Sequence, residues 1–350
     1  VHEHHDPDQA RYTLDIEQSC PDTPGQTDKQ PFHLPLRFGL LAEDGSAIGL
    51  KAGPDNRFQA GDEGPTDVLV SLRERRTRLV VDGLTRRPVV SLLRGFSAPV
   101  RLELDQDPAA LGLLLAHDSD GFARWEAGQR FATRQLLAAI RATMSAGPGA
   151  LEPVASPLFI TAFQGLLLRA DEDPAFTAEA MTIPGLAVLA DQLDAVDVDI
   201  IHTVRERFLD ELLAALEPML LAVYERHHAP SDQRDAVSVG RRALANRALG
   251  FLARGSDGPE LFRAHLRSAR NMTDELQALT LAIEHDVDPE LAAALVGFHA
   301  RWRTDPLVLN KWFSVQAMAS RFETPERVRT LLEHPDFSLR NPNRVRALIA

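Results

Sequence analysis

Histidine clusters are the features of this sequence most able to hold a catalytic metal, but their spacing argues against one. A zinc-binding helix with the pattern His-Glu-x-x-His places two imidazoles on one face because four residues separate them. In the cluster HEHH at residues 2–5, the residue four after His2 is Asp6. The cluster also lies in a polar segment without helical periodicity. We predict a solvated lead-in to the first strand here, and no metal site.

A second histidine pair, His227 and His228, closes an expected helix just before Pro230. Adjacent residues of a helix point to different faces, so these two rings cannot bind one ion together. An imidazole near a helix C-terminus also interacts favourably with the helix dipole. We therefore predict a structural role for both histidines.

Other catalytic signatures are also absent from the sequence. It holds no Gly-x-Ser-x-Gly elbow, no phosphate-binding loop and no Gly-x-Gly-x-x-Gly fingerprint. Serine and histidine residues are too scattered to nominate a triad. Cys20 is the single cysteine, so neither an intrachain disulfide nor a thiolate cluster can form, and no candidate base lies next to it. We assign no catalytic residue.

Two arginines near the C-terminus are better candidates for binding a ligand. Arg344 and Arg346 alternate around Val345 at the start of an expected helix. Positive charge on the first turns of a helix interacts unfavourably with the helix macrodipole, so neither arginine stabilises the helix through this interaction. This placement is mildly anomalous, and it leaves a role in binding a carboxylate open beside a structural one.

Aromatic residues are interpreted mainly as core. The three tryptophans, Trp125, Trp302 and Trp312, are predicted to pack in the core rather than to stack on a ligand. The segment NKWF at residues 310–313 mixes polar and aromatic side chains. It could pack in the core or line a cavity.

Composition places the chain among ordinary globular proteins. Its 350 residues are 44% hydrophobic and 25% charged, and this length favours two domains. The net charge of −12 argues against a surface for phosphate backbones, which needs an excess of Lys and Arg. The longest apolar runs fall short of the ~20 residues of a membrane span, and no signal peptide is visible. We expect a cytoplasmic protein without a nucleic-acid partner or a membrane span.

The first hundred residues show the period-two alternation of strands with one buried face. The alternating apolar residues are Tyr12, Leu14 and Ile16; Leu34, Leu36, Phe38 and Leu40; Val68, Val70 and Leu72; Leu79 and Val81; and Val100, Leu102 and Leu104. Turn residues separate these runs, and Asp44-Gly45 is a hairpin candidate because glycine accepts the positive φ of a primed turn. The pattern predicts a small β-sandwich over residues 1–104.

From about residue 107 the hydrophobic period becomes helical. Expected helix starts combine a capping residue with proline, at Asp107-Pro108, Asp173-Pro174, Asp288-Pro289, Thr324-Pro325 and Asn341-Pro342. Short loops separate the helices, and strand patterns do not return. We predict an all-α superhelix of stacked helical hairpins over residues 105–350.

Six short segments carry a resemblance to a known family. They are PDTPGQTDKQP at 21–31, LLRGFSAPV at 92–100, FARWEA at 122–127, NMTD at 271–274, KWF at 311–313 and NPNRVR at 341–346. Their joint occurrence and order resemble the C-terminal β-sandwich and helical domain of bacterial aminopeptidase N, in the M1 family of zinc metallopeptidases. Because the chain opens without Met and stops within an expected helix at Ala350, we expect a part of a longer protein that ends before its last helices.

The resemblance implies an activity for the longer protein and a supporting role for this part. In that family the zinc ligands of the His-Glu-x-x-His motif, the Gly-x-Met-Glu-Asn motif and the catalytic Tyr lie in the catalytic domain. This chain would then hold no zinc and no other cofactor. Its helical domain would cover the active-site cavity and limit the access of peptides. The implied partners are its own N-terminal and catalytic domains and the peptide substrates.

The resemblance also implies candidate binding residues. A basic residue on the inner wall of the helical domain could meet the C-terminal carboxylate of a peptide. Arg346 is the first candidate, and Lys311, Asn343 and Arg344 are weaker ones.

Two other functions stay open at this point. The chain could be an independent helical scaffold that binds protein partners, or a hydrolase with an unrecognised site. Tight binding of folded proteins in a pull-down would favour the first. Turnover of an aminoacyl-anilide by the chain alone would favour the second.

Overall fold

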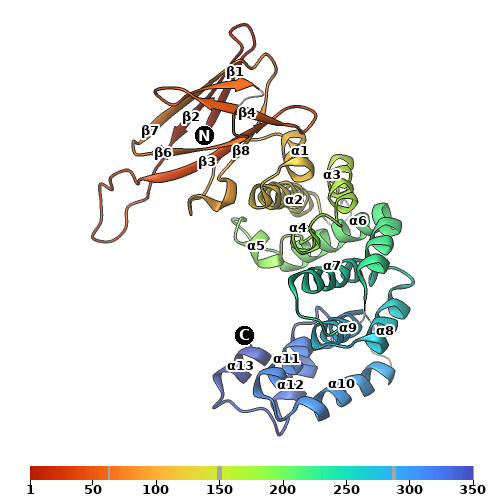
Figure 1. Ribbon diagram of the computed structural model, residues 1–350. Coiled ribbons are helices and arrows are strands. Elements are labelled where there is room, and N and C mark those ends of the chain that lie inside the picture. Colours follow the sequence, from red (N-terminus) through yellow and green to blue (C-terminus); the bar gives the residue numbers. More distant parts are fainter. Residues whose placement is uncertain (62–63, 148–151, 230, 286–288, 350) are drawn as a thin grey trace. The chain divides into compact units, whose positions relative to one another are not determined.

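Strands occupy the first part of the chain and helices the remainder (Figure 1). The computed structural model describes residues 1–61, 64–147, 152–229, 231–285 and 289–349. Within these residues, eight strands are followed by a short 3-10 helix and thirteen α-helices. The expected class, a β domain followed by an all-α domain, is confirmed.

The β domain is one continuous run of hydrogen-bonded strands. The strands are β1 (His2–Asp6), β2 (Arg11–Glu17), β3 (Leu34–Leu41), β4 (Ala47–Ala52), β5 (Arg57–Gly61), β6 (Asp67–Leu72), β7 (Arg76–Asp82) and β8 (Val89–Leu92). They pair in the order β1-β2-β7-β5-β4-β3-β6, and β8 pairs with β3. Only β5 and β7 pair in parallel among the described strands. One apolar core serves the whole run, with Tyr12, Phe38 and Leu50 fully buried.

The alternating patterns of β2, β3, β6 and β7 are confirmed as strands. In β2, for example, Tyr12, Leu14 and Ile16 are buried and the residues between them are not. The expected turn at Asp44-Gly45 is also confirmed, because β3 and β4 form an antiparallel pair around it. Gly45 has the positive φ, 83°, for which glycine was expected.

The prediction of a solvated lead-in at the N-terminus is wrong, because residues 2–6 form strand β1. This strand pairs antiparallel with β2, with His2 opposite Asp15. Tyr12 donates a hydrogen bond from its hydroxyl to Glu3, and Leu84 offers its carbonyl to Nε2 of His5 at 2.8 Å. An edge strand needs only backbone pairing on one side, so it can form from polar residues that show no hydrophobic alternation.

The strand expected around residues 100–104 is also wrong, since this segment is irregular. Its carbonyl groups accept hydrogen bonds from side chains and from the chain terminus instead of from a neighbouring strand. The Val1 ammonium donates to the Glu103 carbonyl at 2.7 Å, and Arg130 donates to the Leu104 carbonyl at 2.5 Å. Leu104 is nevertheless buried in the β core. The alternation of apolar residues in this segment therefore reflects the burial of their side chains, although the segment does not pair as a strand.

A short 3-10 helix, η1 (Arg94–Phe96), follows the last strand and contacts both β3 and helix α2. Two of its residues, Gly95 and Phe96, have positive φ, and so does the preceding residue, Leu93. The left-handed conformation is unfavourable for Leu and Phe, so the surrounding contacts must hold it. The buried side chain of Arg94 supplies several of these contacts.

The helices continue to the end of the described chain. They are α1 (Pro108–His117), α2 (Gly121–Ala146), α3 (Pro157–Leu168), α4 (Pro174–Ala180), α5 (Leu186–Ala190), α6 (Val198–His227), α7 (Ala236–Leu252), α8 (Gly258–Ser268), α9 (Met272–His285), α10 (Pro289–Trp302), α11 (Pro306–Ala317), α12 (Thr324–Leu332) and α13 (Pro342–Ile349). Successive helices such as α1 and α2, or α8 and α9, pack on each other. This neighbour packing is the pattern expected of helical hairpins.

Capping chemistry at the expected helix starts is confirmed for several of them. Asp107 accepts from the Ala110 N–H at 2.8 Å, and Asp173 accepts from the Phe176 N–H at 3.0 Å. Asn341 accepts from the N–H groups of residues 343 and 344. Thr324 does not cap α12 but is its first residue and donates to the Ala319 carbonyl. The expected cap Asp288 lies outside the described residues.

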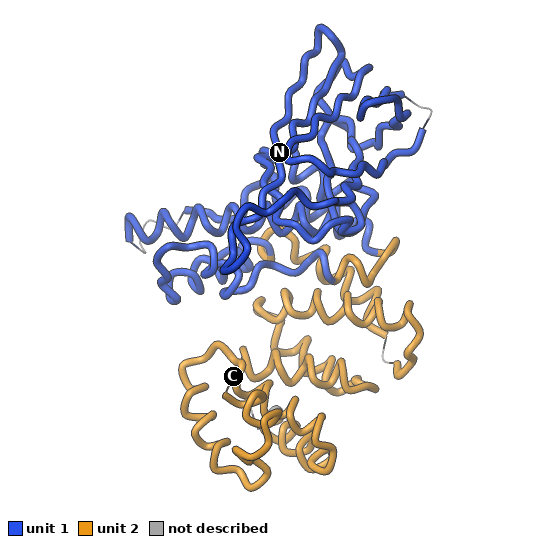
Figure 2. The backbone as a smooth tube through the Cα atoms, turned by 90° about the vertical axis from the view of Figure 1, so that its left-hand side faces the viewer, with its two compact units in different colours: residues 1–170, 179–212 blue, residues 171–178, 213–350 orange. Residues whose placement is uncertain are grey.

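The chain divides into two compact units (Figure 2). Unit 1 comprises Val1–Ala170 and Glu179–Leu212, and unit 2 comprises Asp171–Ala178 and Leu213–Ala350. Unit 1 therefore holds the whole β domain together with α1, α2, α3 and α5. The boundary predicted between residues 104 and 105 separates strands from helices but not these units, and it stays a prediction.

Candidate functional site

The binding candidates near the C-terminus lie on α11 and α13, which pack against each other in unit 2. Trp312 and Phe313 of α11 are buried, with exposed fractions of 8% and 0%. Of the two possibilities left open for this segment, the structure selects core packing. Lys311, the residue before them, is exposed.

Arg344 lies inside this core. Its Nε donates to Oδ1 of Asn310 at 2.7 Å, and its Nη1 donates to the backbone carbonyl of Asp336. The guanidinium also lies over the ring of Phe313, 5.1 Å from the ring centre. Burial lowers the pKa of Arg344, and Asp336 partly offsets this effect.

These contacts correct the prediction that Arg344 binds a ligand. Only 6% of the residue is exposed, and two of its nitrogens, Nε and Nη1, donate to groups of the protein itself. The opposition to the helix dipole, which suggested a ligand, is offset by the bonds to Asn310 and Asp336. Arg344 therefore holds α13 and the preceding loop against α11.

Arg346 has a different environment from Arg344. Two residues of an α-helix are separated by about 200° around its axis, so the two arginines point to nearly opposite sides of α13. Arg346 is exposed and makes no hydrogen bond or ion pair with the residues that the structure describes. Asn343 is also exposed. The structure thus leaves Arg346, Asn343 and Lys311 free for a ligand, but it does not bring the two arginines together.

Replacement of Arg344 by alanine should destabilise unit 2 by about 2 kcal/mol, because it removes a buried side chain and leaves the partly buried carbonyl of Asp336 and amide of Asn310 without their donor. The matched change Arg346→Ala should alter the free energy of unfolding by less than about 0.5 kcal/mol, since it removes an exposed side chain. Denaturant unfolding of both variants measures the difference. Equal effects would contradict the assignment of Arg344 as structural and Arg346 as free.

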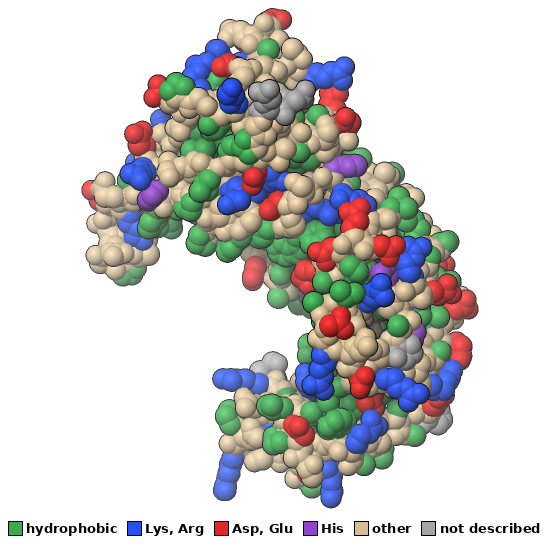
Figure 3. All heavy atoms as spheres, in the orientation of Figure 1, with side chains coloured by type: hydrophobic (Ala, Val, Ile, Leu, Met, Phe, Trp, Pro, Cys, Tyr) green, Lys and Arg blue, Asp and Glu red, His purple; other side chains and the backbone are tan. Residues whose placement is uncertain are grey.

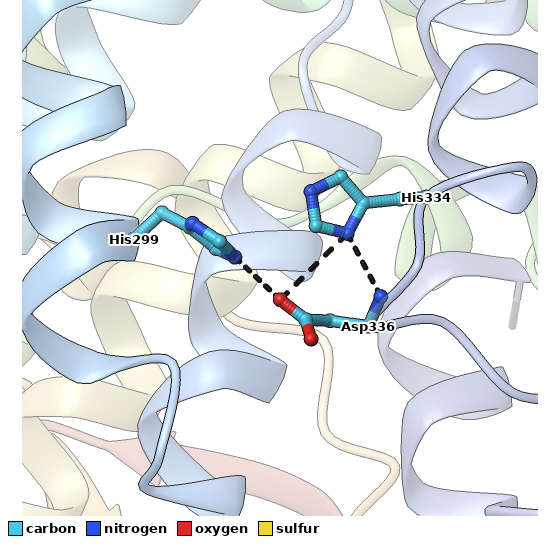
Figure 4. A group of neighbouring side chains, drawn as sticks. All are labelled: His299, His334 and Asp336. Carbon is cyan, nitrogen blue, oxygen red and sulfur yellow. Dashed lines mark hydrogen bonds and ion pairs between the residues drawn. The ribbon is translucent and has the colours of Figure 1, made fainter.

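Next to Arg344, a second group of polar side chains converges: His299, His334 and Asp336 (Figure 4). Nε2 of His299 lies 2.7 Å from Oδ2 of Asp336, and Nδ1 of His334 lies 3.9 Å from the same oxygen. The backbone N–H of Asp336 donates to Nδ1 of His334 at 3.1 Å. One carboxylate oxygen therefore faces a nitrogen of each imidazole.

Aromatic rings of α11 hold these imidazoles in place. The His299 and His334 rings lie 4.7 Å and 5.2 Å from the ring of Trp312, and His334 meets Phe313 edge to face. Burial lowers the pKa of His334, and the nearby His299 and Arg344 lower it further, while Asp336 raises it. All three polar side chains are partly exposed, so solvent reaches them.

The sequence analysis did not identify the group of His299, His334 and Asp336, because no local sequence motif contains all three residues. His299 is in α10, whereas His334 and Asp336 follow α12. Only the spacing of two residues between His334 and Asp336 could have drawn attention. The packing of α10 and α12 on α11 brings the third member near, and periodicity does not reveal that packing.

The remaining histidine predictions have separate outcomes. His227 lies 3.1 Å from Asp171, whereas His228 bonds to Ser268 and stacks on Tyr224, so the two rings point to different partners as predicted.

In β1, strand geometry places His2 and His4 on one face. The charges of His2 and His4 help to lower the pKa of Asp15, after its hydrogen bond from Arg78.

Charged side chains of both signs lie on the face of the molecule shown in Figure 3. On the face shown in Figure 3, Lys and Arg are interspersed with Asp and Glu over the helices and do not form one basic stripe. Among the described helices, none combines the length and apolar character required to cross a membrane.

An Ig-like β domain followed by helical repeats is the class of protein that this fold defines. The chain belongs to the family described as domain of unknown function DUF3458: the Ig-like part matches residues 1–105, and the DUF3458_C part, described as ARM repeats, matches residues 108–350. The likeness to aminopeptidase N expected from the sequence is confirmed by named relatives.

Among these relatives are aminopeptidases N of three bacteria. The Escherichia coli protein is 33% identical over 100% of this chain, the Caulobacter vibrioides protein 35% over 87%, and the Haemophilus influenzae protein 30% over 97%. The chain spans 39%, 34% and 37% of their respective lengths. A crystal structure of Legionella pneumophila aminopeptidase A in complex with aspartic acid matches 99% of the chain, with a TM-score of 0.79 and 25% identity, over 38% of its own length.

Proposed function

We propose that this chain is the non-catalytic C-terminal part of a zinc-dependent aminopeptidase, which releases N-terminal residues from peptides. In this proposal its two domains support the catalytic domain, cover the active-site cavity and limit the access of peptides. The alignment of the whole chain with 39% of the Escherichia coli aminopeptidase N carries the proposal. The remaining length of such a relative leaves room for a separate catalytic part.

The chemistry of the chain supports the non-catalytic assignment. Zinc peptidases of this kind use the zinc ion to activate a water molecule, with His-Glu-x-x-His supplying two ligands and a general base. The sequence lacks this motif. The proposed catalytic zinc would therefore be held by residues outside this chain.

Within this proposal, Arg346 meets the C-terminal carboxylate of a bound peptide. The support is its exposed guanidinium on α13, which the described residues leave without an ion pair. An exposed guanidinium can bind a carboxylate through two parallel hydrogen bonds. Lys311 and Asn343 remain secondary candidates, because both are exposed as well.

Replacing Arg346 by alanine in the longer enzyme should raise KM for short peptides by about threefold to tenfold, the effect of losing an exposed charge-assisted contact. The kinetics on a single-residue anilide should stay unchanged, because that substrate has no distant carboxylate. Steady-state assays with a tripeptide, its C-terminal amide and an aminoacyl-anilide separate these effects. Arg346→Lys is the matched control and should retain part of the binding. An equal loss on all three substrates would show a structural role.

The supporting role can be tested by reconstitution. The part of the longer enzyme that precedes this chain is produced alone and then mixed with the 350-residue chain. We expect the two to associate, and we expect the limit on peptide size to appear only in the complex. Full activity with an unchanged size limit in the preceding part alone would contradict the proposed role.

A further inference from the structure

We propose that His299, His334 and Asp336 bind a divalent transition-metal ion of the zinc class. The site would take two imidazole nitrogens and one carboxylate oxygen as ligands (Figure 4). This donor set suits borderline-soft ions such as Zn²⁺, Co²⁺ and Ni²⁺ better than Mg²⁺ or Ca²⁺, which prefer oxygen ligands. The proposal departs from the sequence-based prediction of no metal in this chain, and it does not depend on the proposed peptidase function.

The separations between the ligand atoms are close to those that an ion requires. Ligands bound to zinc at 2.0–2.1 Å in a tetrahedron lie about 3.3 Å from one another. Oδ2 of Asp336 is 2.7 Å from Nε2 of His299 and 3.9 Å from Nδ1 of His334. All three atoms lie within 4.8 Å of each other. Side-chain movements of about 1 Å would therefore form the site.

The protonation states are compatible with coordination. The N–H of Asp336 donates to Nδ1 of His334, so this nitrogen carries a lone pair and the ring proton lies on Nε2. An ion would take over that lone pair. His299 would coordinate the ion through Nε2, with its ring proton on Nδ1.

The surroundings hold the ligands close to the required positions. The His299 and His334 rings pack on Trp312, and the backbone carbonyl of Asp336 accepts a hydrogen bond from Arg344. Ligands whose orientation is fixed by neighbours bind a metal more tightly than mobile ones. The guanidinium of Arg344 opposes the charge of the ion, but it is bonded to the carbonyl and not to the carboxylate.

An ion at this position would have a structural consequence. It would link the last turn of α10 to the segment between α12 and α13, and side chains of both contact α11. Three protein ligands leave a fourth position for water. An ion bound only by the folded state stabilises that state by RT ln(1 + [ion]/Kd), so the melting temperature rises with the logarithm of the ion concentration once it exceeds Kd.

Calorimetric titration of the metal-free 350-residue chain with Zn²⁺ tests the proposal, with Co²⁺ as a spectroscopic probe. We expect one ion per chain, and visible absorption of bound Co²⁺ at the intensity typical of four-coordinate sites. Asp336→Asn and His299→Gln should each weaken Zn²⁺ binding by at least about tenfold. Circular dichroism without metal establishes that these conservative variants remain folded.

The matched control is the double variant His2→Gln/His4→Gln, which removes the paired histidines of β1. It should leave the binding of Zn²⁺ unchanged. Loss of binding in this control, or retained affinity in Asp336→Asn and His299→Gln, would place the ion elsewhere and overturn the proposal. Failure of the unmodified chain to bind one Zn²⁺ would overturn it as well.

Discussion

Replacing Asp118 by alanine should lower the free energy of unfolding of unit 1 by about 3–5 kcal/mol, because it leaves the buried cation of Arg94 without its partner. Nη2 of Arg94 donates to Oδ1 of Asp118 at 2.8 Å, and the exposed fractions of the two side chains are 4% and 0%. Arg94 also donates to the Thr66 carbonyl and to the Ser119 hydroxyl. The pair therefore ties η1 to the turn between α1 and α2.

Hydrogen exchange of the β3 and α2 amides at increasing denaturant measures this loss within unit 1 alone. The matched control is Asp15→Ala, which breaks an ion pair with Arg78 that is exposed to solvent. Its effect should be much smaller, since exposed ion pairs contribute little. The double variant Arg94→Met/Asp118→Ala should cost less than the sum of the single changes. Additive losses, or an Asp118→Ala effect no larger than that of the control, would contradict the assigned coupling.

Acidification from pH 7 to pH 4 should destabilise unit 2 by up to about 3 kcal/mol through His265. The pKa of His265 is lowered to about 4, mainly by burial and also by the nearby His228, while Asp274 acts in the opposite direction. The folded-state pKa thus lies below the ordinary value near 6.5, and the unfolded chain takes up a proton first. The contribution is fully present above about pH 6.5 and is lost as the pH falls toward 4.

Urea unfolding of unit 2 at several pH values checks this prediction. His265→Gln should flatten the dependence between pH 6.5 and 4, because glutamine does not titrate. His228 also has a pKa lowered by burial, so some dependence of the same sign should remain. A profile of His265→Gln identical to that of the unmodified chain would exclude His265 as the main source.

Two of the segments that carry the family resemblance contain charged residues that are buried and paired with other polar residues. In residues 92–100, Arg94 makes the ion pair with Asp118. In residues 271–274, Asp274 accepts from Asn246 and Asn271, and it lies 3.8 Å from His265. A polar group buried in this way needs its particular partner, and its loss is expensive. The resemblance was therefore informative about the fold.

Much of the fold could be predicted because local chemistry determines it. Alternation in β2 and β3 reflects one buried face, and Asp107-Pro108 caps and starts α1 through contacts within four residues. Strand β1 could not be found in this way, because pairing with β2 and not its own polar sequence defines it.

The candidate site was less predictable, because burial and convergence arise from tertiary packing. Arg344 and Arg346 look equivalent in the sequence, yet packing of α13 on α11 buries the first and exposes the second. His299 joins His334 and Asp336 only after α10 and α12 pack on α11. A pattern of single residues does not contain this information.

The most direct test of the account is the hydrolysis of an aminoacyl-anilide by the 350-residue chain, with and without Zn²⁺, beside the longer enzyme at equal concentration. We expect turnover by the longer enzyme and none by the chain, even when an ion is bound near His299. Zinc-dependent release of the anilide by the chain alone, abolished by a substitution within it, would contradict the assignment of a non-catalytic part.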